Sequence, residues 1–295
     1  MPDLPLWLYL CLALIASTLY VFIYLRVQRL ERQQHTRRIH LLHRLRQLLS
    51  LLQKHRGLSA GILSGDKSLS ADRAVIQQEI QSLLKGAQTE QVLLAPFERW
   101  HTLTEHWGRL QANQQLDVRA CLLQHHQLIR TLLFLIEDLA EASHLAASHP
   151  ELEYLPWVWK GLLPSAEWAG QARALGTAVS AKGCSTPAER IRLRFLCQQL
   201  REESSHTLQR LKAQPDLQKS LLPAQAALQQ FLWTLETQIL QENGPPLNAK
   251  EFFALATQAI ESLLAIADDA LTHALRVHQE INPHLLGATT LVSRG

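Results

Sequence analysis

The sequence has few of the residues that build sheets, disulfides or flexible linkers. Its 295 residues include only 4 Cys, 12 Gly and 1 Met, and 22 Val plus Ile against 60 Leu. Leu keeps its rotamers in a helix whereas β-branched residues lose theirs, so this balance disfavours a β sandwich or a doubly wound sheet. The four Cys lack paired spacing, which argues against a disulfide framework and a zinc site. We therefore expect an all-α protein without a metal or cofactor.

Charged residues are also sparse, at 19% of the chain, with a net charge of only +3. Several of the basic residues form one N-terminal cluster and not a broad basic face, so nucleic acid is not an expected partner. The 47% hydrophobic content is enough for a packed core.

A long hydrophobic run is present at the N-terminus. No residue from Leu4 to Leu25 is charged, and 22 helical residues span roughly 33 Å, enough to cross a bilayer core. Trp7 and Tyr24 lie near its two ends, as interfacial aromatics do. A cleaved signal peptide is the alternative, but the Met-Pro-Asp start has no basic residue. We therefore expect a transmembrane anchor over residues 1–26.

Basic residues follow the anchor on one side. Within residues 26–38 Glu31 opposes five arginines, which are Arg26, Arg29, Arg32, Arg37 and Arg38. The positive-inside rule then places the C-terminal side in the cytoplasm. The expected location is the cell inner membrane, crossed once.

The rest of the chain reads as helices. Apolar residues recur with a period of 3.6 between Gly, Pro and Asn breaks, which predicts seven or eight helices. Their approximate spans are 27–63, 71–85, 89–112, 116–148, 160–182, 187–213, 216–242 and 248–281. Long amphipathic helices with short loops are typical of antiparallel bundles, and residues 149–156 are the expected pivot between two bundles. The expected regions are the anchor (1–26), a basic juxtamembrane helix (27–42), the bundle domain (43–281) and a tail (282–295).

An arginine falls on the apolar face of the first long helix. The heptad-like spacing of Leu45, Leu49 and Leu52 continues to Arg56, which is surrounded by small residues. The stretch Gln53–Ala60 is echoed by Gln171–Ala178, where Arg173 also lies among small residues. A surface-reaching arginine or an ion pair would also explain such a residue. The repeat favours guanidinium groups inside the bundles.

Three stretches carry a family resemblance. Gln53–Gly61, Glu167–Ala178 and Glu251–Ile260 resemble, in order and spacing, signature stretches of the nitrate- and nitrite-sensing (NIT) domain family. The resemblance covers roughly residues 43–280. It implies two four-helix bundles whose interior arginines bind nitrate or nitrite, and the motifs carry this role to Arg56 and Arg173. His55 and Ala172 stand where the family commonly has Glu.

Nitrate suits such a site because it is planar, singly charged and only accepts hydrogen bonds, which matches the flat donor fork of arginine. Gly57 and Gly176 would leave space beside the guanidinium groups. Ser59 and Thr177 would donate to the anion, or else bond a carbonyl of the preceding turn.

Two other patterns favour plainer explanations. The sequence Gly57–Gly61 fits the G-x-S-x-G motif of α/β hydrolases, but that motif must follow a strand. His40 and His43 have a helical spacing suited to chelation, yet a solvated face explains them equally well.

These observations predict a non-catalytic, membrane-anchored sensor that binds nitrate or nitrite and signals to a separate protein, with a homodimer as a further expected arrangement. The alternative is a membrane-anchored helical scaffold whose arginines form internal ion pairs. Glu167, Asp138 and Glu137 are the candidate counterions.

Overall fold

The computed structural model describes residues 6–112, 117–240 and 247–280, and this part of the chain contains no strand. The helices are α1 (Leu6–Leu63), α2 (Ser70–Ala87), α3 (Gln91–Leu94), α4 (Glu98–Ala112), α5 (Val118–Ala142), α6 (Leu145–Ser148), α7 (Leu163–Lys182), α8 (Pro187–Leu211), α9 (Gln218–Thr234) and α10 (Ala249–Glu280). Single π-helical turns lie at Val158–Leu162 and Leu235–Ile239. The all-α expectation is confirmed.

Side-chain caps begin several of these helices. Asp117 accepts a hydrogen bond from the backbone N–H of Ala120 at the start of α5. Thr186 and Glu189 form a reciprocal capping box at the start of α8. Such caps satisfy N–H groups that have no partner within the helix, so polar residues at these positions determine where each helix begins.

Three expected spans differ from the structure. The helix expected at 27–63 is continuous with the hydrophobic run, so one helix, α1, covers both. The span 89–112 is interrupted before α4, around Pro96, whose ring nitrogen has no hydrogen to continue the helical ladder. The span 116–148 is interrupted between α5 and α6, where His144 adopts a left-handed backbone with φ of 49°. The expected tail, 282–295, lies outside the described residues.

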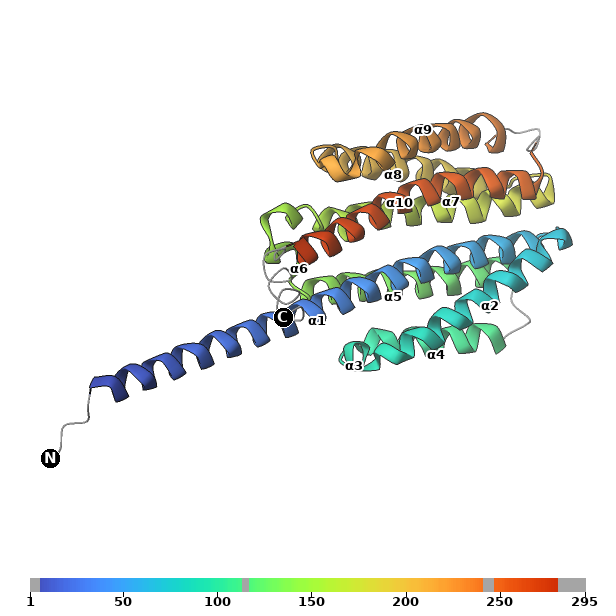
Figure 1. Cartoon of the computed structure of the whole chain (residues 1–295). Coiled ribbons are helices and arrows are strands. Elements are labelled where there is room, and N and C mark those ends of the chain that lie inside the picture. The colour runs from blue at the N-terminus through green and yellow to red at the C-terminus, as the bar shows by residue number, and fades with distance from the viewer. Residues whose placement is uncertain (1–5, 113–116, 241–246, 281–295) are drawn as a thin grey trace, which may run out of the picture.

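The helices pack in two groups that share a core. The first comprises α1, α2, α4 and α5, and the second comprises α7, α8, α9 and α10. The groups meet where α1 lies along α7 and α10 (Figure 1). A single apolar cluster runs through both, from Ile39 to Val277. The α1–α7–α10 contact therefore lies in the interior of the whole helical body.

The N-terminal part of α1 projects away from the packed helices (Figure 1). Its most apolar window has a mean hydropathy of 2.0 and no buried residues. Large side chains such as Leu10 and Phe22 are about 60% exposed there, at 64% and 60% respectively. Among the described residues, α1 is the one helix long and apolar enough to cross a membrane.

Candidate functional site

Glycines bring α1 and α7 close together around two arginines. A Cβ atom added to Gly170 on α7 would lie 2.7 Å from Nη2 of Arg56 on α1. A Cβ added to Gly57 on α1 would lie 3.5 Å from Nε of Arg173 on α7. Each arginine therefore packs beside a glycine of the other helix. A larger residue at position 170 would displace the guanidinium of Arg56, whereas one at position 57 would displace the ring of Phe253. The sequence repeat thus corresponds to two facing helices.

Arg56 is fully buried and bound by a carboxylate. Its Nη1 lies 2.5 Å from Oε1 of Glu167, and its Nη2 donates to Oε2 at 3.1 Å. Gln53 donates to Oε2 at 2.8 Å, and Gln171 donates to Oε1 at 3.0 Å. Both oxygens of Glu167 are thus satisfied, which is the condition under which a buried ion pair is tolerated. Of the three candidate counterions, Glu167 is the one that reaches Arg56.

The other two candidate counterions lie elsewhere. Asp138 pairs with Arg99, and Glu137 lies 3.4 Å from Lys160.

Arg173 is also fully buried, but its surroundings differ. Nη1 donates to Oγ1 of Thr257 at 2.8 Å, and the guanidinium lies over the ring of Phe253, 4.8 Å from the centroid. Its Nε and Nη2 have no hydrogen-bond acceptor among the described residues. Burial, together with the charge of Arg56, lowers the pKa of Arg173 to about 9. A guanidinium with open donors and a depressed pKa is a site that an anion would stabilise.

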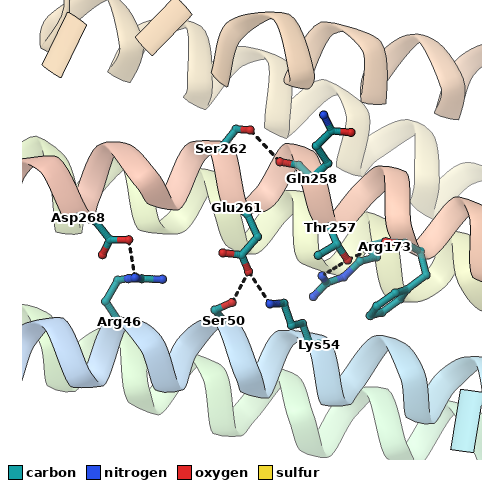
Figure 2. Close-up of polar contacts among 10 residues, drawn as sticks. Arg46, Ser50, Lys54, Arg173, Thr257, Gln258, Glu261, Ser262 and Asp268 are labelled. Atoms are coloured by element: carbon teal, nitrogen blue, oxygen red, sulfur yellow. Dashed lines mark hydrogen bonds and ion pairs between the residues drawn. The ribbon is translucent and has the colours of Figure 1, made fainter. Parts of the chain in front are cut away.

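A row of polar contacts between α1 and α10 leads to Arg173 (Figure 2). Ser50 donates to Glu261 at 2.6 Å, and Lys54 lies 2.9 Å from the same carboxylate. Further along the row, Arg46 pairs with Asp268 at 2.5 Å. Each carboxylate in this row therefore has its own cation, and none bonds to Arg173.

Charge is then unbalanced at one position. Glu167 offsets Arg56, and Glu261 offsets Lys54. Arg173 has no carboxylate partner among the described residues. The centre between α1, α7 and α10 therefore has room in its charge balance for one singly charged anion.

The two candidate hydroxyls take different roles. Thr177 donates to the backbone carbonyl of Arg173 at 2.7 Å, so its proton is used within α7. Ser59 lies 3.5 Å from Nδ1 of His55. Gly176 packs against the ring of Phe252, since an added Cβ would lie 2.4 Å from it. Neither hydroxyl has a hydrogen bond to a guanidinium among the described residues.

Histidines form a second buried group near Arg56. His55 and His125 share a hydrogen bond of 2.9 Å, and His125 also bonds the carbonyl of Cys121 at 2.8 Å. Burial, together with the charge of Arg73, lowers the pKa of His55 to about 4. Burial and the neighbouring His55 hold the pKa of His125 well below its ordinary value. Both rings are therefore neutral at physiological pH and add no charge near Arg56.

A groove between α5, α7 and α8 reaches the ion pair from the surface. It consists of two adjoining hollows of about 510 and 770 Å³ that share Gln171 and Arg192. Glu167 lines the larger hollow and is 7% exposed. Arg192 donates to Gln171, which donates to Glu167, so a hydrogen-bonded chain joins the surface to Arg56.

The remaining sequence patterns lie in plain structural settings. The G-x-S-x-G stretch lies inside α1, and the described residues contain no strand for it to follow. His43 lies 3.4 Å from Asp268, and the described residues contain no group of three or more side chains placed to hold a metal.

Sequence reasoning missed Gln53, Thr257 and Phe253 as parts of the site, although all three lie in the quoted motifs. Their polar or aromatic character alone did not show which of them faces an arginine. Only the register between α1, α7 and α10 brings them together.

The model of a family described as nitrate and nitrite sensing (NIT) matches residues 47–275. Among solved structures, the chain is similar to the NasR transcription antiterminator, with a TM-score of 0.59 and 17% identity; the match covers 92% of this chain and 77% of that chain. At this identity the likeness shows a shared fold. No curated protein matches the chain. The family match covers most of the chain and includes both buried arginines, so the protein belongs to the nitrate and nitrite sensing family.

Proposed function

We propose that this protein is a membrane-anchored sensor that binds nitrate or nitrite between α1, α7 and α10. The observation that carries the proposal is Arg173, a fully buried guanidinium with two open donor groups and no carboxylate partner among the described residues. A buried charge of this kind is costly unless an anion accompanies it. Family membership supplies the class of anion.

The shape of the open donors suits nitrate. Nε and Nη2 of Arg173 lie on one edge of a planar fork, and nitrate and nitrite each present two oxygens in one plane to such a fork. Thr257 holds the opposite part of the guanidinium, and Phe253 covers one face. The guanidinium is thus oriented before the anion arrives, which reduces the entropic cost of binding.

Arg56 is the second arginine of the proposed site, and its charge lies close enough to lower the pKa of Arg173. Gly57 is assigned a supporting role because it leaves space beside Nε of Arg173. Gly176, Ser59 and Thr177 support the site by allowing or maintaining helix packing around it.

Calorimetric titration of the full-length protein in detergent micelles tests the proposal. Nitrate and nitrite should bind with a stoichiometry near one per chain, and sulfate should bind more weakly because the site balances a single charge. Arg173→Ala should lower nitrate affinity about ten- to a hundredfold, the usual cost of losing hydrogen bonds to a charged group. Arg109→Ala, on the exposed face of α4, is the control and should bind as the parent does. Absence of nitrate and nitrite binding in the parent protein would contradict the proposal.

A scaffold without anion binding is the second candidate, and the Arg56–Glu167 pair favours it. In that case both arginines would serve only packing. The open donors of Arg173 are the observation that the scaffold leaves without a role.

The proposed sensor lies in the cell inner membrane, with its helical body in the cytoplasm. The exposed apolar part of α1 and the five arginines that follow it support this placement. Because α1 is continuous, Arg56 lies about 45 Å along the same helix from Arg26. Occupancy of the site would then reach a separate signalling protein, or the second chain of a homodimer, through α1 and the surface of the helical body.

A further inference from the structure

The carboxylate of Glu167 occupies Arg56 in the way that an oxyanion would. It presents two oxygens to Nη1 and Nη2, at 2.5 and 3.1 Å, and the planar carboxylate has the same O–X–O edge as nitrate or nitrite. Gln53 and Gln171 complete the cradle by donating to the same two oxygens. The position beside Arg56 is therefore a built anion site that is filled by a side chain.

The equivalent position beside Arg173 has no such side chain. Gly57 on α1 faces Nε of Arg173, and a glycine supplies no charge. Thr257 accepts one hydrogen bond from Arg173, and the other two donor groups remain open. Of the two arginines of the repeated motif, Arg56 is bound by an internal carboxylate and Arg173 is not.

We infer that Glu167 is an internal anion that takes the place beside Arg56 and thereby limits the site to one external monovalent anion, bound at Arg173. This inference rests on the proposed function. It names Glu167 as the residue that sets how many anions bind per chain and what charge they carry. With Glu167 present, the two arginines and one carboxylate have a net charge of +1. Without Glu167 the same centre has a net charge of +2 and an open position beside Arg56.

The position of Glu167 makes the vacated site reachable. The residue lines the larger hollow of the groove between α5, α7 and α8, and it is 7% exposed. A small anion entering this groove would meet the position of the carboxylate without passing through the apolar core.

Calorimetric titration of full-length variants with nitrate tests the inference. Glu167→Ala should bind two nitrate ions per chain, where the parent binds one, because the cradle of Arg56, Gln53 and Gln171 then takes up an external anion. Formate should raise the melting temperature of Glu167→Ala more than that of the parent, since in the variant it can replace the missing carboxylate beside Arg56 as well as bind at Arg173. Glu137→Ala is the control. Glu137 lines the same hollow, but its carboxylate pairs with Lys160 and not with Arg56, so this variant should bind one nitrate per chain.

A second variant decides the case if Glu167→Ala does not fold. The double variant Arg56→Gln/Glu167→Gln keeps the net charge at +1 and the size of residue 167, and it leaves a shorter polar side chain at position 56. It should bind one nitrate with an affinity within about threefold of the parent, whereas a nitrate contacted directly by Arg56 would lose about tenfold or more.

The outcomes separate the two ideas. A parent that binds nitrate while the double variant does not overturns the inference and leaves the proposed function standing. Retention of one nitrate per chain by folded Glu167→Ala also overturns the inference. A parent that binds no anion overturns the proposed function and the inference together.

Discussion

Gly170 on α7 lies directly against the guanidinium of Arg56 on α1. A Cβ atom at position 170 would lie 2.7 Å from Nη2 of Arg56 and 3.3 Å from the side-chain amide carbon of Gln53. The contact places the ion pair with Glu167 where α1 and α7 pack tightly. Backbone spacing and charge pairing are therefore coupled at one position.

Substitution at Gly170 should separate those two effects. Gly170→Ala gains helix propensity of up to about 1 kcal/mol, but it forces Arg56 away from Glu167 in a tightly packed interface, which typically costs about 1–3 kcal/mol. We expect a net loss of stability. Gly108→Ala is the matched control, because no atom lies within 4 Å of the added Cβ there, and it should be stabilising. Urea unfolding of both variants measures the difference, and equal stabilisation by the two would contradict the role of Gly170.

The two arginines should have opposite effects on stability when anions are absent. Arg56→Met leaves Glu167 buried without its cation and should destabilise the protein by about 3–5 kcal/mol. Arg173→Met removes a buried charge with unsatisfied donors, and we expect it to stabilise the protein by about 1–3 kcal/mol. Thermal melts in a nitrate-free buffer of bulky anions measure both. Destabilisation by Arg173→Met as large as that by Arg56→Met would show that Arg173 has an internal counterion.

Acid should weaken the fold through the buried histidines. The pKa of His55 falls from an ordinary value near 6.5 to about 4 because of burial and the charge of Arg73. Above pH 6.5 the His55 ring is neutral in both the folded and the unfolded chain, so its titration does not lower the free energy of unfolding. Between pH 6.5 and about 4 only the unfolded chain takes up the proton, so stability falls by at most about 3 kcal/mol for this residue.

Unfolding free energies at pH 7.5, 6.0 and 5.0 check this effect. The double variant His55→Gln/His125→Gln should show a smaller decrease between pH 7.5 and 5.0 than the parent. His101→Gln, on an exposed face of α4, should decrease as the parent does. A parent whose stability is unchanged over this range would rule out protonation of buried histidines as a cause of acid sensitivity.

The proposed topology makes a prediction about reporters. Green fluorescent protein fused after Gly295 should fluoresce, and alkaline phosphatase fused there should be inactive. The reason is that the arginines after the apolar run keep the C-terminal side of the chain in the cytoplasm. Replacing Arg26, Arg29 and Arg32 by Gln should weaken this preference. An active phosphatase fusion in the unmodified chain would reverse the orientation.

Local patterns accounted for much of the fold. The 3.6-residue apolar period located the main helices, because one buried face per helix is required whatever the helix packs against. It failed where the interruption depends on one residue, as at Pro96, or on a left-handed backbone, as at His144. Neither interruption removes the apolar spacing on either side of it.

The sequence by itself determined that Arg56 and Arg173 lie on the apolar faces of two helices among small residues, since facial position follows from helical periodicity alone. Only the tertiary structure decided that Glu167 binds Arg56 while Arg173 keeps open donors. Glu167 and Arg173 lie six residues apart on α7, and which arginine the carboxylate reaches depends on the register between α1 and α7. That register depends on the close packing of Gly170 against Arg56, which no pattern within a single helix specifies.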